Sequence, residues 1–174
     1  MTGNLLPGIF AAVAIGVGAT AFMDLWALLQ KRLFGIPALD YRLVGRWIGH
    51  FRHGRFIHDA IGKAAPVPGE AFLGWTAHYA IGVLFAAVLL LVWGSGWTVR
   101  PTLAPALIIG IGSVLAPFLL MQPGLGAGIA ASRTPKPWTA RSRSLVAHLS
   151  FGIGLYLSGL LLAASGILPA AAGS

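Results

Sequence analysis

Residues 16–26, GVGATAFMDLW, lie in the first long apolar run of the chain, residues 5–29. Asp24 is the only carboxylate in any of the apolar runs. Residues four apart lie on one face of a helix. Counted back in fours, the residues that share the face of Asp24 are Thr20, Gly16, Ala12 and Gly8. In a membrane, helices approach closely at such ridges of small residues, and a charged group there indicates a functional site.

Composition and charge placement indicate an integral membrane protein. The chain of 174 residues is 57% apolar and 9% charged, whereas a soluble domain carries about a quarter charged residues. The runs almost free of charge are residues 5–29, 71–93, 103–121 and 145–168. Each approaches or exceeds the ~20 residues that a helix needs to cross the hydrocarbon core. The sequence therefore predicts an all-α polytopic membrane protein, with residues 1–174 forming one domain of four transmembrane helices in one bundle.

The basic residues predict the orientation of the spans. Of the 12 Lys and Arg residues, all but Arg100 lie in residues 31–70 and 122–144. Basic segments stay preferentially in the cytoplasm, so both segments are predicted to be cytoplasmic and both termini to be outside. The N-terminus lacks Lys and Arg, so the first run is expected to be a retained span. The net charge of +8 then reflects orientation and contact with lipid headgroups, and no nucleic-acid partner is expected.

The first cytoplasmic segment carries a helical pattern of its own. From Leu39 to Phe51, apolar residues recur at helical spacing, while Arg42 and Arg46 fall on other faces. This pattern predicts an amphipathic helix lying in the membrane interface. Asp40 is expected to cap its start.

Three histidines and an aspartate in this segment are weak candidates for metal binding. They are His50, His53, His58 and Asp59. Their spacing is compatible with metal ligands, but no zinc-type Cys/His framework accompanies them. Histidine beside arginine also suits contact with anionic headgroups. The sequence therefore predicts no metal site here.

The cytoplasmic end of the third span is expected to be irregular. Pro117 should kink or unwind the helix there. The segment that follows, residues 121–137, is rich in glycine. It lacks the preceding strand and the following acidic residue of a dinucleotide fingerprint. We expect a compact re-entrant or interfacial turn.

The two halves of the chain share short motifs. The pattern AHxxxG occurs at residues 77–82 in the second span and at residues 147–152 in the fourth. IGVGA, residues 15–19, likewise resembles IGIGS, residues 109–113. The first and third spans run in the same direction, as do the second and fourth. The matches therefore predict a parallel duplication of a two-helix unit.

A polar pocket is predicted where the spans approach the cytoplasm. Its residues are Asp24, His78, His148, Thr20, Glu70 and Gln122. A carboxylate and an imidazole inside a protected bundle form a proton-handling set, because burial and neighbouring charges shift pKa values. The alternative is a closed hydrogen-bond lock between Asp24 and one histidine. For Glu70, the alternative is stabilisation of a helix N-terminus.

Six segments together resemble one bacterial family. They are GVGATAFMDLW, VGRWIGHF, GRFIHD, APVPGE, GWTAHYAIG and APFLLMQPGLGAGIAASRTP. Across nearly the whole chain, the sequence is similar to the family catalogued as domain of unknown function 2938. The resemblance implies a four-helix, multi-pass protein of the bacterial inner (plasma) membrane. It implies no activity, substrate or catalytic residue.

The sequence favours transport over catalysis. The 174 residues contain no Ser nucleophile elbow, no HExxH motif and no paired carboxylates, which disfavours a hydrolase, and the absence of cysteine excludes thiolate chemistry. No cofactor is predicted. We expect a small transporter or channel-like protein with a cytoplasm-facing polar pocket for a small solute or proton. A transport pathway would need a homo-oligomer or partner membrane subunits, because four helices make a narrow bundle. The protein would also contact membrane lipids. The alternatives are a non-catalytic accessory subunit of a larger membrane complex, and a redox protein in which His78 and His148 bind haem b or a metal.

Overall fold

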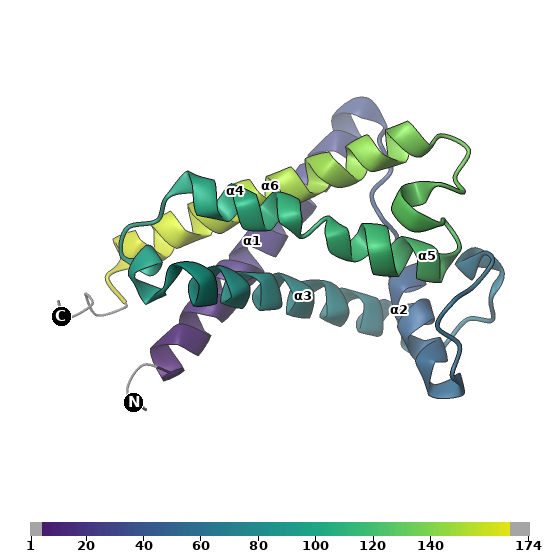
Figure 1. The fold of residues 1–174 in the computed structure, drawn as a ribbon, viewed down its shortest axis with the longest axis horizontal. Coiled ribbons are helices and arrows are strands. Elements are labelled where there is room, and N and C mark those ends of the chain that lie inside the picture. The colour runs from purple at the N-terminus through teal and green to yellow at the C-terminus, as the bar shows by residue number, and fades with distance from the viewer. Residues whose placement is uncertain (1–4, 168–174) are drawn as a thin grey trace.

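The computed structural model describes residues 5–167, and every regular element within that range is helical (Figure 1). The helices that are long and apolar enough to cross a membrane are Leu6–Phe34, Glu70–Trp93, Leu103–Leu125 and Pro137–Ser165. They confirm the predicted all-α class and the four helices of membrane-spanning length.

Some of the helices extend beyond the apolar runs that predict them. α1 (Leu5–Phe34) continues through the basic residues at its end, and α3 (Glu70–Trp93) closely matches the predicted second span. α6 (Pro137–Ser165) begins before the predicted start at residue 145. Its proline lies in the first turn, where the missing N–H removes no helical hydrogen bond. The predicted end of the last span, at Leu168, lies outside the described residues.

The third span is broken near Pro117, as the sequence predicts. α4 (Leu103–Gly112) ends before the proline, Pro117–Met121 form a π-helical turn, and α5 (Gln122–Leu125) completes the crossing. Proline lacks the N–H that a continuous helix needs and its ring crowds the preceding turn. A compact turn with a 3-10 helix at Ile129–Ala131 then leads to α6.

α1 and α6 form the centre of the bundle. α1 packs against α3 and α6, and α6 packs against α4, whereas α3 and α4 contact each other much less. Successive long helices run in opposite directions, so α2 (Tyr41–Gly49) and α5 lie at the end opposite the start of α1 (Figure 1). Both basic segments therefore lie at one end of the bundle. Asp40 caps α2 by accepting a hydrogen bond from the N–H of Arg42, as predicted, while the interfacial position of this helix stays a prediction.

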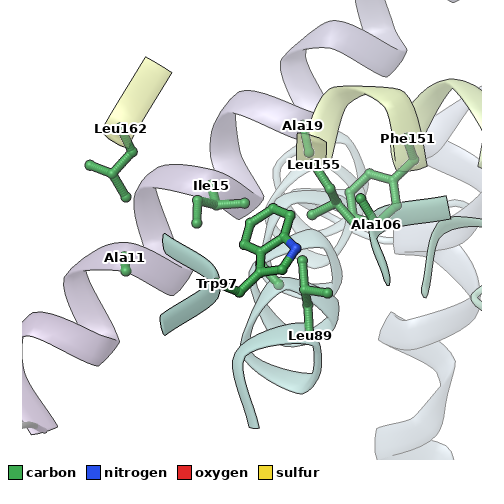
Figure 2. Packing of buried hydrophobic residues seen from close by; sticks show 10 residues of the cluster. Ala11, Ile15, Ala19, Leu89, Trp97, Ala106, Phe151, Leu155 and Leu162 are labelled. Atoms are coloured by element: carbon green, nitrogen blue, oxygen red, sulfur yellow. The ribbon is translucent and has the colours of Figure 1, made fainter. Parts of the chain in front are cut away.

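Small side chains allow the long helices to pack around an apolar core. Its buried members are Ala11, Ile15, Ala19, Ala86, Leu89, Trp97, Ala106, Phe151, Leu155 and Leu162. Figure 2 shows Trp97 in the middle of this cluster, between Ile15 of α1 and Leu89 of α3. Trp97 comes from the short connection between α3 and α4. This connection thus contributes a large side chain to the core between the spans.

Two glycine contacts repeat between the halves of the chain. A Cβ added at Gly16 would overlap the backbone of Gly82 and Val83. A Cβ added at Gly110 would overlap the backbone of Gly152. Gly16 and Gly110 are the first glycines of IGVGA and IGIGS, and the other two glycines each end an AHxxxG segment. Equivalent positions therefore join α1 to α3 and α4 to α6, which agrees with a duplicated two-helix unit.

Replacing Gly110 with valine should destabilise the protein. The new side chain would force α4 away from α6, whereas a Cβ at Gly112 on the same helix meets nothing within 4 Å. We expect Gly110→Val to lower the free energy of unfolding by about 1–3 kcal/mol more than the matched control Gly112→Val. Melting in detergent, followed by circular dichroism, measures the difference. Equal melting midpoints for the two variants would contradict the close contact.

Candidate functional site

A cavity of about 240 Å³ lies between α1, α2, α3, the π-helical turn and α6. Most of the side chains that line it are apolar. The polar exceptions are Thr20, Tyr41, His78, Ser113 and His148. The structure thus brings both span histidines and Thr20 to one space. Asp24, Glu70 and Gln122 lie outside its lining.

Asp24 is paired with His78 across the interface of α1 and α3. Nε2 of His78 lies 2.9 Å from Oδ1 of Asp24, and the hydroxyl of Tyr79 donates to Oδ2 over 3.1 Å. The side chains of His78 and Asp24 are 13% and 21% exposed. Both carboxylate oxygens therefore have a protein partner, as a largely buried acid requires. Because His78 lines the cavity and Asp24 does not, the imidazole stands between the acid and the cavity.

Tyr41 covers one face of the His78 ring. The two ring centroids are 4.1 Å apart and the ring planes are inclined by 25°. Burial, and then the charge of Asp24, raise the pKa of the Tyr41 hydroxyl. Tyr41 therefore packs on the imidazole as a neutral ring.

Thr20 is satisfied within its own helix. Its hydroxyl donates to the carbonyl of Gly16 over 2.8 Å, a common arrangement for threonine inside a helix. The same side chain lies against Gly82 of α3, where a Cβ would overlap the hydroxyl oxygen. Thr20 therefore acts here as a close packing contact one turn from Asp24.

His148 has a different partner from His78. Oγ of Ser113 lies 2.7 Å from Nδ1 of His148 and donates its hydrogen to the carbonyl of Gly110 over 2.6 Å. The Ser113 oxygen therefore accepts a hydrogen from Nδ1 of His148. Within residues 5–167, the second nitrogens, Nε2 of His148 and Nδ1 of His78, have no hydrogen-bond partner. When neutral, each ring thus offers one acceptor nitrogen.

Glu70 joins α2 to the start of α3. Its two oxygens accept hydrogen bonds from Arg46, with Nε–Oε2 and Nη2–Oε1 distances of 2.8 and 2.9 Å. It also accepts from the backbone N–H of Val67 over 3.1 Å. Gly45 and Gly74 lie at the contact between these two helices, where a Cβ would overlap the facing backbone. Glu70 therefore stands at the start of α3 and, through its ion pair with Arg46, clamps α2 to α3.

Gln122 lies at the same end of the bundle, away from the cavity lining. Its Nε2 donates to Oγ of Ser144 over 3.3 Å, which ties α5 to α6. Its Oε1 is buried, and no hydrogen-bond partner for it exists within the described range.

The three histidines among the weak metal candidates of the first basic segment each have other partners. A ring nitrogen of His50 lies 3.0 Å from the carbonyl of Ala65. Arg52 donates to Nε2 of His53. Nδ1 of His58 lies 3.3 Å from the carbonyl of Gly124, and burial lowers the pKa of this imidazole. Across residues 5–167, no three His, Cys, Asp or Glu side chains gather as a metal site would require.

Several residues of the site were not found by sequence reasoning. Tyr79 directly follows His78 but has no sequence signal that links it to Asp24, and the sequence places the clamp residue Arg46 only on a non-apolar face of the amphipathic helix. Ser113 is the last residue of IGIGS, so the repeat could have drawn attention to it. Tyr41 had no sequence signal, because its contact with His78 depends on how α2 docks.

Comparison with known proteins gives one match. The model of a family described as protein of unknown function (DUF2938) matches residues 13–162. No curated protein and no solved structure matches the chain. The match covers all four long helices in whole or in large part.

Removing the clamp should loosen α2. Arg46→Gln leaves Glu70 without its charged partner in a pair whose side chains are only 13% and 16% exposed. We expect its melting midpoint in detergent to fall by at least about 3 °C. The matched control is Arg42→Gln, because the Arg42–Asp40 pair is 64% and 41% exposed and such surface pairs contribute little. A midpoint for Arg46→Gln as high as that of Arg42→Gln would show that the clamp does not hold α2.

Proposed function

The chain belongs to the DUF2938 family, and we propose that it is a small multi-pass transporter or channel-like protein in which Asp24 and His78 handle protons. The observation that carries the proposal is the 2.9 Å contact between these two side chains inside the spans. Ionisable groups within spans are rare and mark ion or substrate pathways. An imidazole next to a carboxylate can accept a proton on one side and release it on the other.

The surroundings of His78 favour this role over a closed lock. A lock needs both nitrogens of the imidazole to be engaged or sealed by packing. Among the residues that the structure describes, Asp24 engages Nε2 of His78 and none engages Nδ1, and the ring also borders the cavity. A proton or a hydrogen-bonding solute in the cavity can therefore reach the pair through Nδ1.

We place this protein in the bacterial inner membrane, with both basic segments in the cytoplasm. Asp24 lies in the second half of α1, toward Lys31 and Arg32, so the pair is nearer the cytoplasmic side in this orientation. Gly16 of α1 and Gly82 of α3 already face each other's helix within the chain. A homo-oligomer or a partner membrane subunit would therefore bind through other, lipid-facing surfaces.

Asp24→Asn should abolish proton movement, because asparagine keeps the size of the side chain but cannot bind a proton. Purified protein is reconstituted into liposomes that contain a pH-sensitive dye, and an imposed pH gradient is followed with valinomycin and potassium present to balance charge. We expect wild-type vesicles to lose the gradient faster than empty liposomes, and Asp24→Asn vesicles to lose it at the rate of empty ones.

Asp59→Asn is the matched control, because it removes a carboxylate from an exposed position outside the spans. It should keep the wild-type rate. Wild-type flux by Asp24→Asn would remove Asp24 from the pathway. A wild-type rate equal to that of empty liposomes would contradict proton transport itself.

A further inference from the structure

We propose that the cavity binds a neutral amphiphile from the bilayer: an alcohol with an apolar body, whose single hydroxyl group donates a hydrogen bond to Nε2 of His148. This inference rests on the proposed transport function and names the class of molecule that the same site takes. Four features of the cavity support it: the apolar wall, the absence of charge, the two acceptor nitrogens, and an opening toward lipid.

The wall selects an uncharged, mainly apolar body. Side chains such as Met23, Phe85 and Phe151 line the cavity, and no Lys, Arg, Asp or Glu of the described chain does. A charged ligand would lie there without a counterion in direct contact, which is costly in an apolar space. A sugar or nucleotide would leave most of its polar groups unpaired. Ligand pockets of this type combine an apolar wall with a few polar groups that orient the ligand.

The two histidines select the head of the ligand. Nε2 of His78 is directed to Asp24, and Nδ1 of His148 to Ser113. The remaining nitrogen of each neutral ring is an acceptor and needs a donor. A hydroxyl group has one hydrogen, which it donates to one of these nitrogens, Nε2 of His148, whereas an ether or an alkane has none to donate.

The exposed part of the lining indicates the entrance. Ile81 of α3 and Leu120 of the π-helical turn both line the cavity, yet are 46% and 67% exposed. α3 and α4 contact each other little. Exposed apolar side chains on a span face the acyl chains of the bilayer, so the cavity opens to lipid between α3 and the π-helical turn. An amphiphile dissolved in the membrane can therefore enter without crossing water.

Photolabelling in lipid nanodiscs tests the proposal. The probe is decan-1-ol that carries a diazirine on its chain and an alkyne for detection, and mass spectrometry locates the adducts. We expect adducts on the peptides that contain Ile81 and Leu120. Unlabelled decan-1-ol should compete at least about fivefold more strongly than 1-methoxydecane or decane, compared at equal mole fraction in the bilayer, because only the alcohol donates a hydrogen bond.

Two variants test separately the binding of the apolar chain and the binding of the hydroxyl group. Ala116→Phe places a phenyl ring in the cavity lining and should strongly reduce competable labelling, whereas Ala104→Phe, at an exposed position of α4 outside the lining, should leave it unchanged. His148→Phe keeps an aromatic ring but removes the acceptor nitrogen. It should reduce the potency of decan-1-ol about fivefold to tenfold and leave the potency of decane unchanged.

Three results would overturn the proposal: equal potency of decan-1-ol and decane on the wild-type protein, labelling that Ala116→Phe does not reduce, or no loss of alcohol preference in His148→Phe. Should Ala116→Phe fail to fold, as judged by size-exclusion chromatography, His148→Phe still decides. No proton gradient is present in this assay, so its outcome is separate from that of the flux measurement on Asp24→Asn.

Discussion

The hydrogen bond between Asp24 and His78 is the interaction on which the arrangement of α1 and α3 depends. A charged side chain within a span is costly, and the cost falls if its oxygens find partners. His78 and Tyr79 supply them from α3. These short bonds require the two helices to lie close together in one register. The glycines of the ridge meet that requirement, because a Cβ at Gly16 would overlap the facing backbone.

The second half of the chain repeats the helix contact but not the acid. α4 and α6 meet at Gly110 and Gly152 as α1 and α3 meet at the equivalent glycines. His148, the counterpart of His78, is paired with the neutral Ser113. The two imidazoles line one cavity, one of them bonded to a carboxylate and the other to a hydroxyl group. This asymmetry is the physical basis of the function and the ligand proposed above.

The parts of the fold that depend on local sequence pattern could be predicted from the sequence. Apolar runs predicted the long helices, Pro117 predicted the break in the third span, and the four-residue spacing predicted which face of α1 would meet a neighbour. The ion pair of Arg46 with Glu70 could not be predicted from the sequence, because it joins residues 24 positions apart and depends on how α2 docks on α3. The stacking of Tyr41 on His78 was missed for the same reason. Pattern places a residue on a face, but long-range docking selects its partner.

If Asp24 carries an exchangeable proton and is not a permanently ionised lock, an apolar carbodiimide should react with it. N,N′-dicyclohexylcarbodiimide dissolves in the bilayer and modifies protonated carboxyl groups. The chain has only four acidic residues, so mass spectrometry can assign each adduct without ambiguity. We predict an adduct on Asp24 in native membranes. An unmodified Asp24, in a sample whose exposed Asp40 and Asp59 react with a water-soluble carbodiimide, would contradict a proton-handling role and leave the pair as a structural lock.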